Sequence, residues 1–291
     1  MTGTTSIAQV LITFGGMFLL GLLADLLGRR TALPRVTLLL LAGFAIGPSM
    51  LNWLPPFTEQ WFPVLTDIAL AMIGFLLGQN LTRERFEELG RSVLSMSLGE
   101  VALTTVLVFA GLLIAGMPVE LALLLAGLAP ATDPAATVDV VHENQAEGQF
   151  TDILLGIVAI DDAWGLLAFT VLLALAQAFS GHGMPAESLL TGVCEIGGAI
   201  FLGVLLGLPM AYLTGRVRPG EPTQAEALGL VLLCAGIAKW LGVSYILAAI
   251  VLGSVVANFA THHTRLFRAI KGIEWPFLIL FFLLAGAALT M

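Results

Sequence analysis

Long apolar runs, each close to the length that crosses a bilayer, dominate this sequence. A membrane-spanning helix needs about 20 mostly apolar residues. Only 11% of the 291 residues are charged, whereas a soluble domain carries roughly a quarter. The runs predict an all-α polytopic membrane protein with about ten transmembrane helices in a lipid bilayer. They lie at about 5–27, 33–52, 62–81, 92–115, 119–143, 151–179, 189–214, 224–241, 243–259 and 274–291.

Basic residues gather on one side of these predicted spans. Of the 12 Lys and Arg residues, all except Lys239 follow an odd-numbered run. The positive-inside rule places those loops in the cytoplasm and the N-terminus outside. We therefore expect a multi-pass protein of the cell inner membrane. The sequence pI is near 4.9 and there is no basic patch, so nucleic-acid binding is not expected.

A weak internal repeat links early and late spans. The segment 41–47 (LAGFAIG) resembles 247–253 (LAAIVLG) at an offset of 206, and 75–77 (FLL) matches 282–284 at an offset of 207. A shift of seven spans reverses the orientation in the membrane, and inverted repeats are typical of secondary transporters. Matches of Leu, Ala and Gly are common in membrane helices, so chance similarity is the alternative.

Two adjacent acids, Asp161 and Asp162, interrupt the apolar run 151–179 about ten residues from its start. A charge at mid-membrane depth costs about 2.5–3.5 kcal/mol on insertion scales, so it needs a partner, a cavity or a function. Neighbouring helical residues point about 100° apart. Two close carboxylates in a low dielectric do not both ionise cheaply. This pattern predicts a site for a proton or a small cation; the alternative is a buried pair satisfied by backbone donors and a basic residue.

The preceding run contains two prolines four residues apart, Pro130 and Pro134, which a continuous helix does not accommodate. Asp133 followed by Pro134 is a typical N-cap and first-position pair. We therefore expect two half-helices with an unwound centre, which a membrane tolerates where the backbone lines a cavity or protein. A simple kink, or a loop that ends one helix, is the alternative.

Together these motifs resemble one known group of transporters. The segment 131–135 (ATDPA) followed by Asp161-Asp162 is similar to the cation/proton antiporter superfamily, nearest to bacterial sodium/proton exchangers and their Kef-type potassium relatives. Segments 33–48 and 241–245 resemble that superfamily's second and ninth spans. The resemblance implies exchange of Na⁺ or K⁺ for H⁺ by a homodimer, without a cofactor and without a resident metal.

The resemblance also assigns roles to individual residues. Asp162 would be the main cation and proton carrier, and Asp161 its neighbour that modulates charge. Thr132 and Asp133 would form the unwound crossing beside the ion. Of the other membrane acids, Glu100 and Glu195 are either pore-lining groups or members of helix–helix hydrogen bonds. The charged run from Arg83 to Arg91 is expected to be a solvated cytoplasmic loop.

The resemblance implies a division of the chain into four parts. Residues 1–91 would hold the panel and dimerisation helices of the first repeat, and 92–180 the core helices with the broken helix and the Asp-Asp motif. Residues 181–219 would form a linker helix, and 220–291 the panel helices of the second repeat. The superfamily carries further core helices after these, so we expect an incomplete inverted-repeat antiporter fold.

Two other functions deserve comparison with transport. A non-transporting membrane subunit, or a fragment of an antiporter, would need no complete ion pathway. An intramembrane aspartyl protease also uses two aspartates, but its carboxylates face each other from two helices, whereas adjacent residues diverge. We therefore expect a transporter and not an enzyme.

Overall fold

The computed structural model describes residues 7–28, 34–55, 57–179, 186–214, 223–260 and 263–289. Within these ranges the chain forms eleven α helices and no strand. The helices are α1 (Ile7–Gly28), α2 (Arg35–Ile46), α3 (Phe57–Gly78), α4 (Arg83–Ile114), α5 (Val119–Leu128), α6 (Pro134–Glu143), α7 (Gln149–Phe179), α8 (Ala186–Thr214), α9 (Thr223–Leu241), α10 (Tyr245–Phe259) and α11 (His263–Ala287).

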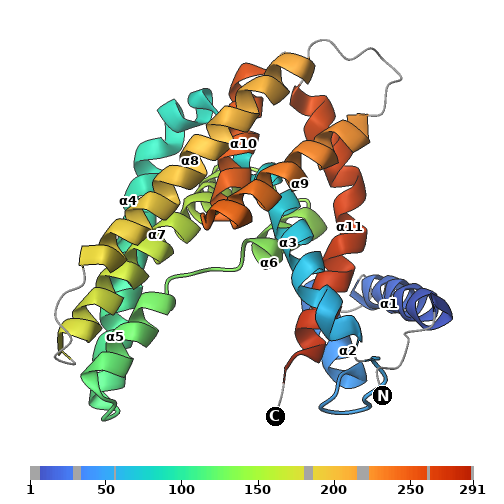
Figure 1. The fold of residues 1–291 in the computed structure, drawn as a ribbon, viewed down its shortest axis with the longest axis horizontal. Helices are drawn as coiled ribbons and strands as arrows, with labels where there is room; N and C mark the ends of the chain where they lie inside the picture. The colour runs from blue at the N-terminus through green and yellow to red at the C-terminus, as the bar shows by residue number, and fades with distance from the viewer. Residues whose placement is uncertain are drawn as a thin grey trace.

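The helices form two groups that α8 joins. In the first group α4, α5 and α7 pack against one another. In the second, α10 packs on α3 and α9, and α11 packs on α2, α3 and α9. Helix α8 contacts α10 along its length and also α7, so it connects the groups. Figure 1 shows α4, α5, α7 and α8 along one flank and α1, α2, α3 and α11 along the other.

Six segments are long and apolar enough to cross a membrane on their own. They lie in α1, α3, α4, α8, α9 and α11, and α7 makes a seventh if its two parts, bent by 41°, count as one span. The shorter apolar helices are α2, α5 and α10. The predicted fifth run, 119–143, is two helices, as its prolines require. Over the described residues the structure therefore confirms an all-helical protein with several helices long and apolar enough to cross a membrane.

The charged run from Arg83 to Arg91 is helical, so the expectation of a loop there was wrong. Helix α4 begins at Arg83 and continues through the apolar segment without a break. Glu84 lies in its first turn, where a negative charge favours the helix dipole. Arg83 pairs with Glu87 one turn later at 2.9 Å. Hydropathy alone missed these turns because Arg, Glu and Leu favour a helix in water as well as in lipid.

Close backbone contacts hold the second group together. A Cβ atom at Gly43 of α2 would overlap the backbone of Leu283 in α11, and one at Gly286 would overlap Leu40. The crossing of α3 and α10 is similar, because a Cβ at Gly253 would overlap the carbonyl of Phe75. Glycines let helix backbones approach closely, which is how membrane helices gain packing energy without a hydrophobic drive.

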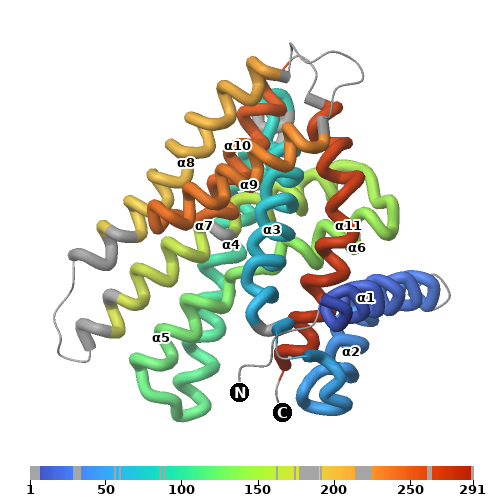
Figure 2. Tube along the Cα trace, turned by 45° about the vertical axis from the view of Figure 1, so that its right-hand side comes forward, coloured from blue at the N-terminus to red at the C-terminus, as the bar shows by residue number. Residues whose placement is uncertain are grey.

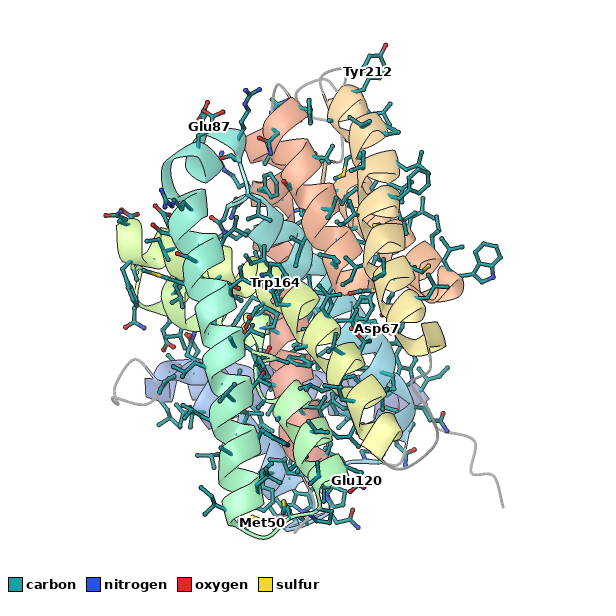
Figure 3. All side chains as sticks on the ribbon, turned by 90° about the vertical axis from the view of Figure 1, so that its left-hand side faces the viewer. Met50, Asp67, Glu87, Glu120, Trp164 and Tyr212 are labelled. Atoms are coloured by element: carbon teal, nitrogen blue, oxygen red, sulfur yellow. The ribbon has the colours of Figure 1, made fainter. Side chains whose placement is uncertain are left out.

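The described links between helices lie at two opposite ends of the molecule. Figure 3 shows Glu87 and Tyr212 near one end and Met50 and Glu120 near the opposite end, with Trp164 and Asp67 between them. The link after α3 and the end of α8 thus lie opposite the links after α2 and α4. Helix α1 contacts α2 and α11 and lies across their direction, as Figures 1 and 2 show.

Candidate ion-binding site

The break between α5 and α6 has the geometry that its prolines predict. Helix α5 ends at Leu128, and α6 starts at Pro134 with Asp133 as its N-cap. The carboxylate of Asp133 accepts a hydrogen bond from the backbone N–H of Ala135 at 2.9 Å. The unwound stretch from Ala131 to Asp133 is exposed. The interpretation of this run as two half-helices with an unwound centre is therefore confirmed.

The unwound stretch meets α7 at one of the predicted acids. The hydroxyl of Thr132 donates a hydrogen bond to Oδ2 of Asp161 at 2.9 Å. Asp161 is 1% exposed, and its second oxygen, Oδ1, has no hydrogen-bond partner among the described residues. Thr132 and Asp161 are thus brought together, whereas one oxygen of Asp133 is already committed to the helix cap.

Asp162 lies at the bend of α7. The two straight parts of the helix are Gln149–Asp161 and Ala163–Leu173, so its backbone sits at the junction. The side chain of Asp162 lies outside the described residues. Sharp bends in helices have identifiable local causes. Here the bend coincides with the two adjacent acids.

A third acid reaches this site from a different helix. Glu100 of α4 lies close enough to Asp161 for the two carboxyl groups to interact electrostatically. One of its oxygens, Oε1, accepts a hydrogen bond from Thr104 at 3.1 Å within α4. The sequence left Glu100 between a pore-lining acid and a helix–helix hydrogen bond, and the structure brings it beside the aspartate pair.

A cavity lies next to the α7 segment that carries the acids of the site, although none of those acids is among the described residues that line it. It has a volume of about 1010 Å³, and Ile160, the residue before Asp161, forms part of its wall. Glu84 and Glu87 of α4 also line it, at the end of the molecule where Figure 3 labels Glu87. The remaining lining residues come mainly from the link between α3 and α4 and from the end of α10. Arg83 lines the cavity as well and pairs with Glu87, so Glu84 is the unbalanced negative charge among the described lining residues.

The sequence interpretation missed a second buried charge cluster. Arg35, at the start of α2, donates to Asp25 of α1 at 3.0 Å and to Asp139 of α6 at 2.8 Å. Its backbone N–H donates to Glu143 at 3.1 Å, and its guanidinium lies 4.2 Å from the ring centre of Trp275. The cluster ties four helices together. Asp139 between two valines in an otherwise apolar half-helix was the signal that could have revealed it.

Lys239 has a partner that the sequence did not suggest. This lysine, the exception to the charge pattern, forms an ion pair with Asp67 of α3 and also lies 5.1 Å from the ring centre of Tyr245. It does not pair with Asp161. Among the described residues no lysine or arginine forms an ion pair with Asp161 or Glu100.

Comparison with known proteins identifies the family. The model of the sodium/hydrogen exchanger transmembrane family matches residues 14–291, nearly the whole chain. The chain belongs to this family. It is accordingly a membrane protein of an antiporter family, not an enzyme, and the protease reading is excluded.

Individual relatives agree with this assignment. The chain is 22% identical over 285 residues to the ammonium/H⁺ antiporter subunit AmhT of Alkalihalophilus pseudofirmus, covering 96% of this chain and 70% of that protein. It is 25% identical over 276 residues to the Na⁺/H⁺-K⁺ antiporter GerN of Bacillus cereus, covering 92% and 68%.

A solved antiporter shares the fold. One structure of the sodium proton antiporter MjNhaP1 of Methanocaldococcus jannaschii matches with a TM-score of 0.79 at 18% identity, covering 99% of this chain and 71% of that one. Another, of the same protein at pH 8, matches with a TM-score of 0.65 at 20% identity, covering 97% and 72%. The chain therefore has the MjNhaP1 fold over its described length.

Proposed function

We propose that this protein exchanges a monovalent cation, Na⁺ or K⁺, for protons across the cell inner membrane. The observation that carries the proposal is the contact between the broken helix and the acidic pair, in which Thr132 donates to the buried Asp161. Broken helices whose unwound backbone meets a buried acid are the way transporters build a midplane ion site. The relatives, which include an ammonium/H⁺ antiporter subunit and a Na⁺/H⁺-K⁺ antiporter, support it.

The proposed roles follow from position. Asp162 carries the cation or the proton, Asp161 sets the charge of the site, and Thr132 and Asp133 supply oxygen atoms from the unwound crossing. Cation and proton compete for the same carboxylate oxygens, so binding of one releases the other. The cavity whose wall includes Ile160 lies beside this part of α7, and we propose that ions reach the site from its side.

The proposed topology has ten spans with the N-terminus outside. Adding α2, α10 and the α5–α6 pair to the seven spans counted above gives that number. Helix α1 is counted here by its length and composition, because it lies across α2 and α11 in the structure. The separation of the links after α2 and α4 from the link after α3 and the end of α8 supports the alternation of the other spans (Figure 3). The positive-inside rule then puts Glu87 and the cavity in the cytoplasm.

The packing supports an inverted repeat as well. The sequence repeat maps α2 onto α10 and α3 onto α11. A two-fold relation would then map the α2–α11 crossing onto the α10–α3 crossing, and both crossings are present with glycines at the contact. We propose that residues 1–91 and 220–291 form a panel that pairs two protomers as a homodimer. Residues 92–180 form the core, and 181–219 the linking helix.

A transport assay with a matched control tests the proposal. The chain is reconstituted into proteoliposomes that contain a pH-sensitive dye, and gradients of Na⁺, K⁺ and NH₄⁺ are applied in turn. We expect cation-driven proton movement that Asp162→Asn abolishes. Asp152→Asn, on the same helix in its first turn, should leave transport intact. No response of the intact protein to any of the three cations would overturn the proposal and favour the non-transporting subunit.

A further inference from the structure

Two buried carboxyl groups, one from α4 and one from α7, meet at the candidate site. The two helices run in the same direction, because Val93 of α4 packs against Gly156 of α7 and, further along, Glu100 reaches Asp161. Glu100 lies seven residues beyond Val93, about 10 Å along the axis, and Asp161 lies five residues beyond Gly156, about 8 Å. Parallel packing therefore brings the two acids to nearly the same depth.

Each of these carboxyl groups has one satisfied oxygen and one unsatisfied oxygen. Oδ2 of Asp161 accepts from Thr132 at 2.9 Å, and Oε1 of Glu100 accepts from Thr104 at 3.1 Å. The other oxygens, Oδ1 of Asp161 and Oε2 of Glu100, are buried and have no hydrogen-bond partner among the described residues. A buried charged oxygen that is left without a partner destabilises the folded protein.

Within the described part of the chain, the two unsatisfied oxygens both lack a hydrogen-bond donor or a positive charge. Two carboxylates both accept hydrogen bonds and neither donates, so a close pair of them requires a positive charge between them. No lysine or arginine among the described residues forms an ion pair with either group. Asp133, the next acid, directs an oxygen to the backbone of Ala135 instead. A small cation or a proton between Asp161 and Glu100 would supply this positive charge.

We propose that Glu100 is a further ligand of the transported cation and binds it together with Asp161. The inference rests on the proposed exchange function. Oxygen ligands from two helices replace part of the ion's hydration shell. Thr104 and Thr132 orient the two carboxylates by holding the oxygens that do not face the ion. Because α4 and α7 both belong to the proposed core, the ion would travel with one rigid group of helices.

Cation binding measured without transport tests the role of Glu100. Isothermal titration calorimetry with NaCl or KCl is carried out on the detergent-solubilised chain at one fixed pH. Glu100→Gln keeps the size of the side chain and should weaken cation binding at least tenfold, as should Asp161→Asn. Glu147→Gln, an exposed position in the link between α6 and α7, should stay within twofold. Glu100→Asp should recover part of the affinity, because a carboxylate is restored.

The combination of variants separates a ligand from a structural residue. Two residues that bind one ion are coupled, so the double variant should lose less affinity than the two single losses multiplied together. If Glu100 only stabilises α4, Glu100→Gln should lower the unfolding temperature measured without cation and leave the affinity for the cation unchanged. Wild-type affinity in a folded Glu100→Gln variant overturns the inference, and so does the absence of cation binding by the unmodified chain. Cation binding without proton exchange in proteoliposomes would instead reject the proposed function and keep Glu100 as a ligand.

Discussion

Replacing Arg35 by methionine would remove the positive charge at the centre of the buried cluster on α1, α2 and α6. The arginine side chain is 16% exposed and its partner Asp139 is 4% exposed, so water replaces little of the lost interaction. Breaking a buried ion pair by deleting one partner costs about 3–5 kcal/mol, because the other charge stays buried. At about 2 °C per kcal/mol for a large chain, the unfolding temperature should fall by roughly 6–10 °C.

The assay is thermal unfolding of the purified chain in detergent, followed by intrinsic tryptophan fluorescence. The double variant Arg35→Met/Asp139→Asn removes both charges and should recover at least half of the loss. Arg83→Met is the control, because Arg83 and its partner Glu87 are 86% and 66% exposed; exposed pairs contribute less than about 1 kcal/mol. An Arg35→Met variant no less stable than Arg83→Met would refute the reasoning.

The remaining predictions concern helix ends and helix crossings. Asp133→Ala removes the cap of α6 and should cost about 1 kcal/mol of folding stability, seen as a lower unfolding temperature. Asp133→Asn keeps an oxygen acceptor and should lose less stability. Equal losses for the two variants would contradict the role of Asp133 as a cap. Gly43→Ala places a methyl group on the backbone of Leu283 and should cost about 1–3 kcal/mol. Gly111→Ala meets nothing within 4 Å and serves as its control, so similar unfolding temperatures for the two would rule out the close crossing.

The sequence predicted the elements whose chemistry is local. Pro130 and Pro134 predicted the break, and the Asp133–Pro134 pair predicted the start of α6 to the residue, because a cap and a proline act over one turn. Apolar runs predicted most helices. They misplaced the start of α4 by about two and a half turns, because the membrane signal ends where the charged part of the helix begins.

Contacts between distant segments were beyond the sequence. Asp161 was found as a costly charge, but its bond to Thr132 depends on how α7 meets the unwound stretch. Glu100 beside Asp161 depends on the parallel register of α4 and α7, and Arg35 with Asp139 joins residues 104 positions apart. A single sequence that is interpreted without an alignment of relatives contains no signal for such pairs.

The glycine crossings of α2 with α11 and of α3 with α10 have a mechanical consequence. Where two backbones touch, no side chain lies between them to change rotamer and absorb a shift. Each crossing therefore resists sliding and rotation of its two helices. Together α2, α3, α10 and α11 form one rigid frame. Any displacement of α4, α5 and α7 relative to that frame must be taken up outside it, by tilting of α8 and by the unwound residues before α6.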